Sequence, residues 1–517
     1  MPIETDRTHT PAGSAPGSLS GRALAAAKWS YVGVAARVLS QFVSQIILAR
    51  LLGPVPFGMF GICMLTASMA SIISEMGLDS ALIQKRTLTD ADIRVAFTRV
   101  VAASAGLALL LALAAPLLAQ FFGDPELTWP LRGIALNVVI SSFSVVPVAL
   151  LKRRLEMRTV YIAQVASYIT GFVLVGTGLA LAGAGVWSLV GALLAQYLTE
   201  AVLVYRAAPH TLRPLLVAED SALQRFAGRV LLTNLANWAS ENVDNLLVGK
   251  LLGVQALGLY SVSYNLMRTP TNHLVFTLQQ VLFSASARMQ DDAAALGRAY
   301  LLTLNAIMLV SLPTFLGAAV LSETLVAALY GEKWLAAAPV LLPLALAMPV
   351  HAAMAIAGPI LAGRGMIGKE LKVQFWIALL LIVAIFVSAR FSLEALAWSV
   401  FGVYLVRALW MTAVLIRVLG LPARAPLTSL RGALPFSLVI AGSLFAADYW
   451  LQMLGVLAPL RLAFALALGA VLALGGGLLC ARFLVGPDLA GLLLQHTNDE
   501  SMRVPRWFRQ YLGARLS

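Results

Sequence analysis

Polar side chains recur at helical spacing within the apolar stretches of this sequence. The first set follows the pattern i, i+3, i+4, i+7, i+8, which places its members on one face of a helix; it consists of Arg37, Ser40, Gln41, Ser44 and Gln45. A guanidinium group on such a face can hold phosphate oxygens through paired N–H donors. The pattern therefore indicates a polar stripe that can bind an anion.

A second stripe has the same spacing, and three further apolar stretches add polar residues on one face. The second stripe consists of Asn234, Asn237, Glu241, Asp244 and Asn245, and the further residues are Ser261, Tyr264, Asn265, Arg268 and Asn272, then Ser68, Ser71 and Glu75, and finally Arg407. We expect all of them to face one water-filled cleft. The predicted substrate-binding residues are Arg37, Gln41, Arg268, Arg407, Asn237 and Asn265. The predicted ion-coupling or gate residues are Glu75, Glu241 and Asp244.

A structural role is an equal alternative for these charges. An ionisable residue at the centre of a membrane helix costs about 2.5–3.5 kcal/mol, so it persists where it is paired or faces water. The three arginines could therefore pair with the three acids merely to hold helices together. We interpret His273 and His351 as packing residues, and the run Lys152–Arg154 as a loop that directs membrane insertion.

Composition places these stripes in a membrane protein. Of 517 residues, 60% are hydrophobic, against roughly 45–50% in a soluble domain, and only 12% are charged, about half the usual share. The excess apolar surface must face lipid. The net charge of +13 lies in short loops between apolar stretches, which argues against nucleic-acid binding. Cys63 and Cys480 lie in apolar stretches and offer neither a disulfide framework nor a metal cluster.

Apolar runs of about 20 residues, the length that spans a bilayer, predict an all-α integral membrane fold of about fourteen helices. We expect them at 28–49, 58–82, 96–120, 130–151, 159–181, 186–205, 230–250, 257–284, 299–321, 338–361, 371–389, 395–416, 433–454 and 461–484. The polar N-terminus lacks the layout of a cleaved signal, so the first span is expected to remain as an anchor.

The distribution of Lys and Arg predicts the orientation. If the N-terminus is cytoplasmic and the spans alternate, 28 of the 37 basic residues lie in cytoplasmic segments and 6 in external loops, and the other three are Arg37, Arg268 and Arg407 within spans. Cytoplasmic loops of membrane proteins carry such an excess. Both termini, residues 1–27 and 485–517, are therefore predicted to be cytoplasmic.

An internal repeat divides the spans. Ile46–Phe60 aligns with Leu246–Tyr260 at an offset of 200, Phe121–Gly123 with Leu329–Gly331 at 208, and Gly185–Gly191 with Leu396–Gly402 at 211. The three matches in order predict two parallel six-helix lobes, residues 28–206 and 230–417, joined by a cytoplasmic linker at 207–229. Such lobes would enclose a central cavity that opens to each side in turn. The two helices within 433–484 have no counterpart.

The sequence does not favour an enzyme. It has no Gly-rich nucleotide-binding loop with Lys and Ser/Thr, no metal-ligand cluster and no Ser/His/Asp set in a soluble domain. The best enzyme candidate is an integral-membrane glycan polymerase or ligase. Such enzymes usually expose a sizeable external loop, whereas the external loops predicted here reach roughly 15 residues at most.

Two stretches resemble a known family. Glu75–Ile93 (EMGLDSALIQKRTLTDADI) and Asn242–Pro270 (NVDNLLVGKLLGVQALGLYSVSYNLMRTP) are similar to signatures of Wzx-type polysaccharide flippases of the multidrug/oligosaccharidyl-lipid/polysaccharide (MOP) exporter superfamily. The resemblance covers about residues 25–485. It implies two six-helix lobes, a cationic cavity, and alternating access without a cofactor. The implied substrate is an undecaprenyl-diphosphate-linked oligosaccharide for lipopolysaccharide or exopolysaccharide, moved from the cytoplasmic to the periplasmic leaflet of the bacterial inner membrane.

The resemblance leaves several points open. Coupling to H⁺ or Na⁺ is suspected for the family, and a glycan polymerase and glycosyltransferases are candidate partners. Flippases of lipid-linked peptidoglycan precursors also have fourteen helices and a cationic cavity. Drug–cation antiporters of the superfamily stop at twelve helices, and three cavity arginines would repel their substrates. The tail from Gly486, with Arg503, Arg506, Trp507 and Arg509, departs from the family pattern and is interpreted as an interfacial anchor.

Overall fold

The computed structural model describes residues 19–75, 77–85, 87–215, 221–289 and 292–479, and these ranges are almost entirely helical. Cys480, the C-terminal tail and residues 1–18 lie outside the described residues. We call residues 19–207 the first half. Its elements are α1 (Leu19–Leu52), α2 (Pro54–Glu75), α3 (Leu78–Gln84), α4 (Asp90–Phe122), η1 (Pro125–Leu127), α5 (Thr128–Arg153), α6 (Met157–Tyr168), η2 (Ile169–Gly176), α7 (Thr177–Leu181) and α8 (Trp187–Ala207).

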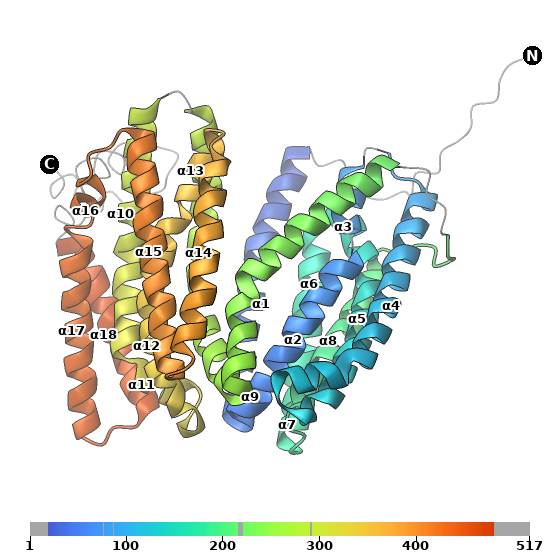
Figure 1. Ribbon diagram of the computed structural model, residues 1–517, viewed down its shortest axis with the longest axis horizontal. Helices are drawn as coiled ribbons and strands as arrows, with labels where there is room; N and C mark the ends of the chain where they lie inside the picture. The colour runs from blue at the N-terminus through green and yellow to red at the C-terminus, as the bar shows by residue number, and fades with distance from the viewer. Residues whose placement is uncertain (1–18, 76, 86, 216–220, 290–291, 480–517) are drawn as a thin grey trace, which may run out of the picture.

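Residues 221–419 are called the second half, and a helical hairpin follows it. The second half contains α9 (Ser221–Arg288), α10 (Ala293–Val320), α11 (Ser322–Leu329), η3 (Glu332–Ala337), α12 (Ala338–Ala355), α13 (Ala357–Gly363), α14 (Ile367–Ser388) and α15 (Leu393–Leu419). The remaining elements are α16 (Ala425–Ser429), α17 (Ala433–Met453) and α18 (Ala458–Leu479). The two halves stand side by side, with α17 and α18 on the outer side of the second half (Figure 1).

The described residues contain 13 helices long and apolar enough to cross a membrane, and one of them bends back on itself. In this stretch, Glu241–Asn272, the backbone leaves helical geometry at Gly253 (φ 84°, ψ 179°). The first arm of α9 (221–252) ends beside Phe121, whereas the second arm (254–288) reaches Ala355 through Gln279. The arms thus run in opposite directions, and α9 supplies both predicted spans, 230–250 and 257–284. The expected all-α membrane fold of about fourteen helices is confirmed, with 13 candidate spans in the described residues.

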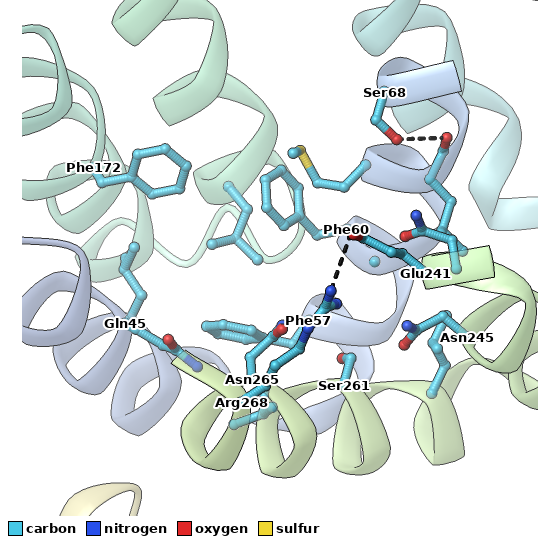
Figure 2. A pocket seen from close by; sticks show the side chains of 18 of the residues that line it. Gln45, Phe57, Phe60, Ser68, Phe172, Glu241, Asn245, Ser261, Asn265 and Arg268 are labelled. Atoms are coloured by element: carbon cyan, nitrogen blue, oxygen red, sulfur yellow. Dashed lines mark hydrogen bonds and ion pairs between the residues drawn. The ribbon is translucent and has the colours of Figure 1, made fainter. Parts of the chain in front are cut away.

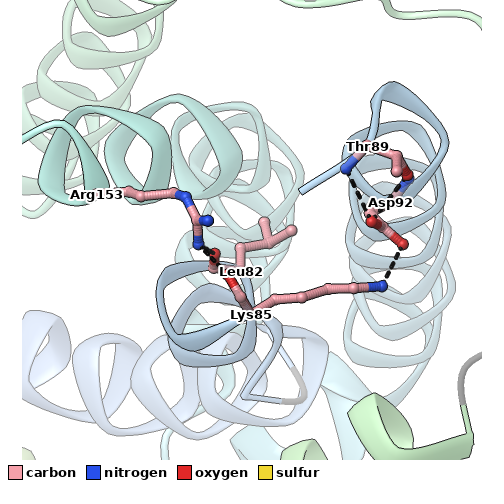
Figure 3. A network of polar contacts seen from close by, with 5 residues as sticks. All are labelled: Leu82, Lys85, Thr89, Asp92 and Arg153. Carbon is pink, nitrogen blue, oxygen red and sulfur yellow. Dashed lines mark hydrogen bonds and ion pairs between the residues drawn. The ribbon is translucent and has the colours of Figure 1, made fainter. Parts of the chain in front are cut away.

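The loops divide into two ends. The end that bears Lys85, Lys152 and Arg364 is called the basic end, and the end that bears Gly53 and Gly331 is called the opposite end. Arg153 holds α3 at the basic end by donating to the carbonyls of Leu82, 2.9 Å away, and Lys85. Lys85 in turn forms a 2.8 Å ion pair with Asp92 of α4 (Figure 3). These contacts connect α3, α4 and α5 around Glu75–Ile93, the first of the two stretches that resemble the flippase family.

The backbone reproduces the start of the repeat. Gly53 and Gly253, 200 residues apart, have nearly the same positive φ of 83° and 84°, and each turns the chain between two spans. Glycine adopts this conformation without the Cβ clash that other residues suffer. The third alignment is not reproduced in register, because Trp187 begins α8 whereas Trp398 lies inside α15.

Among the clusters of buried apolar residues in the described ranges, the largest one joins the two halves, and it lies toward the opposite end. The largest cluster combines first-half residues such as Leu48, Ile62 and Leu131 with second-half residues such as Tyr260 and Trp334. Two other clusters do not join the halves: one spans residues 82–208, and the other spans residues 275–433 and includes Ala433 of α17. The halves are therefore packed together at the opposite end and have separate cores toward the basic end. Figure 1 shows the helices of the two halves side by side.

The hairpin of α17 and α18 is anchored to the second half. The Thr324 hydroxyl of α11 donates to both carboxylate oxygens of Asp448 in α17, at 2.9 and 2.8 Å. Arg461 of α18, which is 7% exposed, lies 3.8 Å from the same carboxylate. Leu321, Ile440, Leu444 and Ala465 form a small apolar core beside these polar contacts.

Candidate functional site

A cavity of about 560 Å³ lies between α2 of the first half and both arms of α9. The sequence explains its shape, because Gly253 reverses α9 and so places two polar faces of one long helix around the same space. The polar lining residues are Gln45, Ser68, Glu241, Asn242, Asn245, Ser261, Asn265 and Arg268. Apolar side chains, among them Phe57, Phe60 and Phe172, cover the rest (Figure 2).

Arg268 and Glu241 face each other across this cavity. Arg268 Nη2 on the second arm lies 3.0 Å from Glu241 Oε2 on the first arm (Figure 2). The Glu241 side chain is 59% exposed and that of Arg268 24%. Arg268 also lies over the Tyr264 ring, 5.6 Å from its centroid, and its buried Nε has no hydrogen-bond partner. The ion pair is weak because solvent reaches the Glu241 carboxylate, and it occupies one nitrogen of the guanidinium, so other N–H donors are left for an anion.

The cavity brings together three of the nine predicted site residues, Glu241, Asn265 and Arg268. Asp244 is buried behind its wall, where it accepts hydrogen bonds from the Tyr260 hydroxyl at 3.0 Å and from the Asn245 amide. Gln41 is half-buried and Asn237 exposed, and neither is part of this lining. Arg268 therefore both lines a cavity and is paired with an acidic residue.

Arg37 contacts a different set of residues. Its Nη1 donates to Gln164 Oε1 of α6 at 3.3 Å, and the carboxylate of Glu200 in α8, itself 8% exposed, interacts with it electrostatically. Arg37 thus contacts residues inside the first half, whereas the structural alternative considered from the sequence was a pairing with Glu75, Glu241 or Asp244. Sequence reasoning missed Glu200, although an ionisable residue within the predicted span 186–205 is the same signal that identified Glu241.

The remaining predicted residues lie nearer the basic end. Glu75 is the last residue of α2 and interacts electrostatically with Asp79 and Lys152. Arg407 of α15 is half-buried and interacts with Glu370 of α14. His351 packs against Tyr404, with ring centroids 5.5 Å apart, in keeping with a packing role. The side chain of His273 lies outside the described part of the chain.

A second cavity, of about 580 Å³, lies between α10, α11, α17 and α18. Its lining includes Met267, Leu309, Pro313, Leu444 and Leu466 and contains no charged side chain. Because an apolar wall offers no donors to an anion, the cavity that carries Arg268 is the candidate site for a charged substrate.

Comparisons with known proteins agree with this architecture. Lipopolysaccharide biosynthesis protein WzxC of Escherichia coli (strain K12) is 23% identical over 390 residues, 72% of this chain and 77% of WzxC. Succinoglycan biosynthesis transport protein ExoT of Rhizobium meliloti (strain 1021) is 27% identical over 357 residues, 69% and 71% of the two chains. The structure of lipid II flippase MurJ in an inward closed conformation superposes with a TM-score of 0.69 at 12% identity, covering 89% of this chain and 99% of MurJ.

The MurJ comparison establishes a shared fold, and the family assignment comes from the sequence. The family model described as "Polysaccharide biosynthesis protein" matches residues 47–339, more than half of the chain. This region runs from the end of α1 to the start of α12 and contains both arms of α9 with the Arg268 cavity. The chain therefore belongs to the polysaccharide biosynthesis protein family, and its fold is that of a multi-span membrane transporter.

Proposed function

We propose that this protein flips an undecaprenyl-diphosphate-linked oligosaccharide from the cytoplasmic to the periplasmic leaflet of the bacterial inner membrane. The observation that carries the proposal is Arg268, a guanidinium that lines a cavity between the halves and is paired with a largely exposed carboxylate, that of Glu241. The family and the relatives named for lipopolysaccharide and succinoglycan biosynthesis support the class of substrate.

The physics of the substrate explains why such a cavity is needed. A diphosphate with several sugars would lose its hydration in hydrocarbon, so it does not cross a bilayer unaided. Arg268 can replace part of that hydration with charge-assisted hydrogen bonds to phosphate oxygens, and Asn265, Asn245 and Gln45 offer amides to sugar hydroxyls. The lipid tail remains in the bilayer between the halves.

The orientation follows from the basic loops. The basic end carries most of the Lys and Arg residues of the loops, as cytoplasmic ends do, and the halves have separate cores toward that end. We infer that the described conformation, in which the halves are packed together at the opposite end, receives substrate from the cytoplasm. Both termini and the 207–229 linker would be cytoplasmic. Arg37 and Arg407 are proposed as further anion contacts, and Glu75, Glu241 and Asp244 as residues that couple H⁺ or Na⁺ or act at a gate.

Substitution of Arg268 tests the function. In a strain whose own flippase gene is deleted, Arg268→Ala is expected to lower surface glycan at least about tenfold at equal protein abundance, since a hydrogen bond to a charged group contributes about 1.5–3 kcal/mol. Arg268→Lys should retain part of the activity, because it keeps the charge but loses the paired donors. Arg390→Ala, in an exposed position outside the cavity, is the matched control. Normal export by Arg268→Ala would refute the site.

Complementation separates the alternatives. Growth of a strain depleted of its lipid II flippase, without any restored surface glycan, would instead assign the protein to peptidoglycan-precursor transport. Drug resistance alone would favour an antiporter. Formation of polymer by the purified protein from lipid-linked repeat units would show a polymerase or ligase rather than a transporter. Glycosyltransferases and a polymerase are the expected partners of a glycan flippase.

A further inference from the structure

Two basic residues at equivalent positions of the repeat join the halves at the opposite end. Arg50, near the end of α1, donates from Nε to the carbonyl of Leu329 at 2.8 Å and from Nη2 to the carbonyl of Ala328. Lys250, near the end of the first arm of α9, donates from Nζ to the carbonyl of Phe121. Arg50 and Lys250 are 200 residues apart and lie three residues before Gly53 and Gly253.

The acceptors are related by the same repeat. Phe121–Gly123 aligns with Leu329–Gly331, so Phe121 corresponds to Leu329. Both acceptor carbonyls lie in the last turn of a helix, α4 and α11 respectively. Such carbonyls have no intrahelical partner and carry the negative end of the helix dipole, which favours a cation. Each half thus extends a cation to the same helix end of the other half.

The two contacts differ in strength. On the α11 side, Trp334 Nε1 also donates to the carbonyl of Ala49 at 2.8 Å, and Lys333 Nζ to that of Leu51 at 3.3 Å. On the α4 side, Lys250 Nζ lies 4.5 Å from the centroid of the Phe121 ring. The contact between α1 and the α11–η3 segment therefore has more hydrogen bonds than the contact between α9 and α4.

We propose that these paired cation-to-helix-end contacts form a closure that holds the opposite end shut and must break before the cavity opens on that side. Because α11 is also held by Asp448 through Thr324, the hairpin of α17 and α18 sets the position of one acceptor. This gives the two helices that lack a repeat counterpart a role in the closure. The inference rests on the proposed transport by alternating access, but its first test requires no transported substrate.

The test measures access to the cavity from each side of the membrane. Cys63 and Cys480 are replaced by Ala, Ser261→Cys supplies a thiol in the cavity lining, and a membrane-impermeant maleimide is applied to right-side-out and inverted vesicles. When Arg50→Ala and Lys250→Ala are added to this background, the thiol at position 261 should react with reagent applied at the opposite end roughly tenfold faster than in the unchanged background, which is the parent. Arg50→Lys, which copies the residue at the equivalent position of the repeat, should lie close to the parent.

A matched control distinguishes the closure from a general loss of surface charge. Arg132 is an exposed arginine at the same end that donates to the carbonyl of Ala112, within the first half, so Arg132→Ala should not change access. Thr324→Val, which removes the hydroxyl that binds Asp448, should increase access by a smaller factor than the double variant. Equal labelling of the double variant and Arg132→Ala, at equal folded abundance, would overturn the proposal.

A reducible crosslink supplies the converse test. Phe121→Cys/Lys250→Cys, joined in the membrane by a short bifunctional reagent that forms a disulfide with each thiol, should block glycan export and keep the opposite end closed, and reduction should restore both. If crosslinking and reduction change maleimide labelling from the opposite end but never change glycan export, the closure is supported and the proposed transport function fails. If the crosslinked protein exports normally, the closure itself is refuted.

Discussion

Gly58 of α2 and Gly258 of the second arm of α9 meet at a helix crossing in which each lies against the backbone of the other helix. A Cβ atom on Gly58 would lie 1.8 Å from the carbonyl oxygen of Val254, and one on Gly258 would lie 2.1 Å from that of Pro54. The two glycines are equivalent in the repeat. Small residues allow such close approach of helices within a membrane, and here the approach joins the two halves.

Substitution at this crossing should loosen the joined end. Gly58→Ala and Gly258→Ala are each expected to destabilise the folded protein by about 1–3 kcal/mol, since the added methyl group meets backbone that cannot move away. The loss would appear as a lower Tm of the purified protein in detergent. Gly106→Ala is the control, because a Cβ there meets nothing within 4 Å. An unchanged Tm for both crossing variants would contradict this account.

The pairing of Arg268 with Glu241 predicts competition with the substrate. Glu241→Gln removes the carboxylate that occupies Arg268, so inorganic pyrophosphate should bind roughly 1.4- to fivefold more tightly, the range that corresponds to a solvent-screened ion pair of about 0.2–1 kcal/mol. The measurement is the pyrophosphate concentration that gives half of the ligand-induced rise in Tm. Arg268→Ala/Glu241→Gln is the control and should show no such gain. Weaker binding by the single variant would contradict the competition.

Tyr260 should stabilise the fold through the buried Asp244. Tyr260→Phe removes a 3.0 Å hydrogen bond to a carboxylate that is 5% exposed, so the free energy of unfolding should fall by about 1–3 kcal/mol. Thermal unfolding followed by circular dichroism would report the change. Tyr449→Phe, at a position that is 50% exposed, should leave the Tm unchanged. A stable Tyr260→Phe protein would mean that Asp244 does not need this donor.

His210, in the loop after α8, predicts a pH dependence of stability. Its ring lies edge to face against Phe97 and Tyr205, with centroids 5.0 and 5.5 Å away, and burial holds the pKa of the His210 imidazole below its ordinary value. The unfolded chain therefore binds this proton more readily. The resulting stability is present above the ordinary histidine pKa of about 6.5 and is lost as the pH falls.

The variant His210→Phe isolates this contribution. Between about pH 8 and about pH 5.5, two conditions on either side of the ordinary histidine pKa, the parent should lose more Tm than the variant does. Titration of all other groups is common to both proteins and cancels in the comparison. An equal loss in both proteins would show that protonation of His210 does not oppose folding.

Most of the fold could be predicted from the sequence because the bilayer restricts the choices. Backbone groups in hydrocarbon must bond within helices, so apolar runs located the spans, and the repeat around Gly53 and Gly253 located the equivalent turns. The packing of the first arm of α9 on α2 was not predicted. It depends on contacts such as the 2.8 Å bond from Trp238 to Ser68, which periodicity does not encode.

The site was predicted in part. Helical spacing correctly selected Glu241, Asn265 and Arg268 as residues that face one cavity. It could not assign partners, because spacing gives the face of a helix but not the helix that lies opposite. Arg37 therefore turned out to contact Gln164, and Asp244 to accept from Tyr260 inside the wall. Glu200 was missed although it shares the helical spacing i, i+3, i+4 with Gln196 and Thr199.

The contacts of Arg50 and Lys250 end on main-chain carbonyls rather than on carboxylates. A carbonyl oxygen gains no proton in the physiological range and is present whatever side chain the residue carries. Substitutions at Ala328, Leu329 or Phe121 would therefore preserve the bonding atom, and only the two cations offer a simple genetic handle on these bonds. Acidification outside the cell would weaken an ion pair with aspartate or glutamate, but it would not weaken these bonds. An external proton could therefore open the cavity at the opposite end only by binding elsewhere in the molecule.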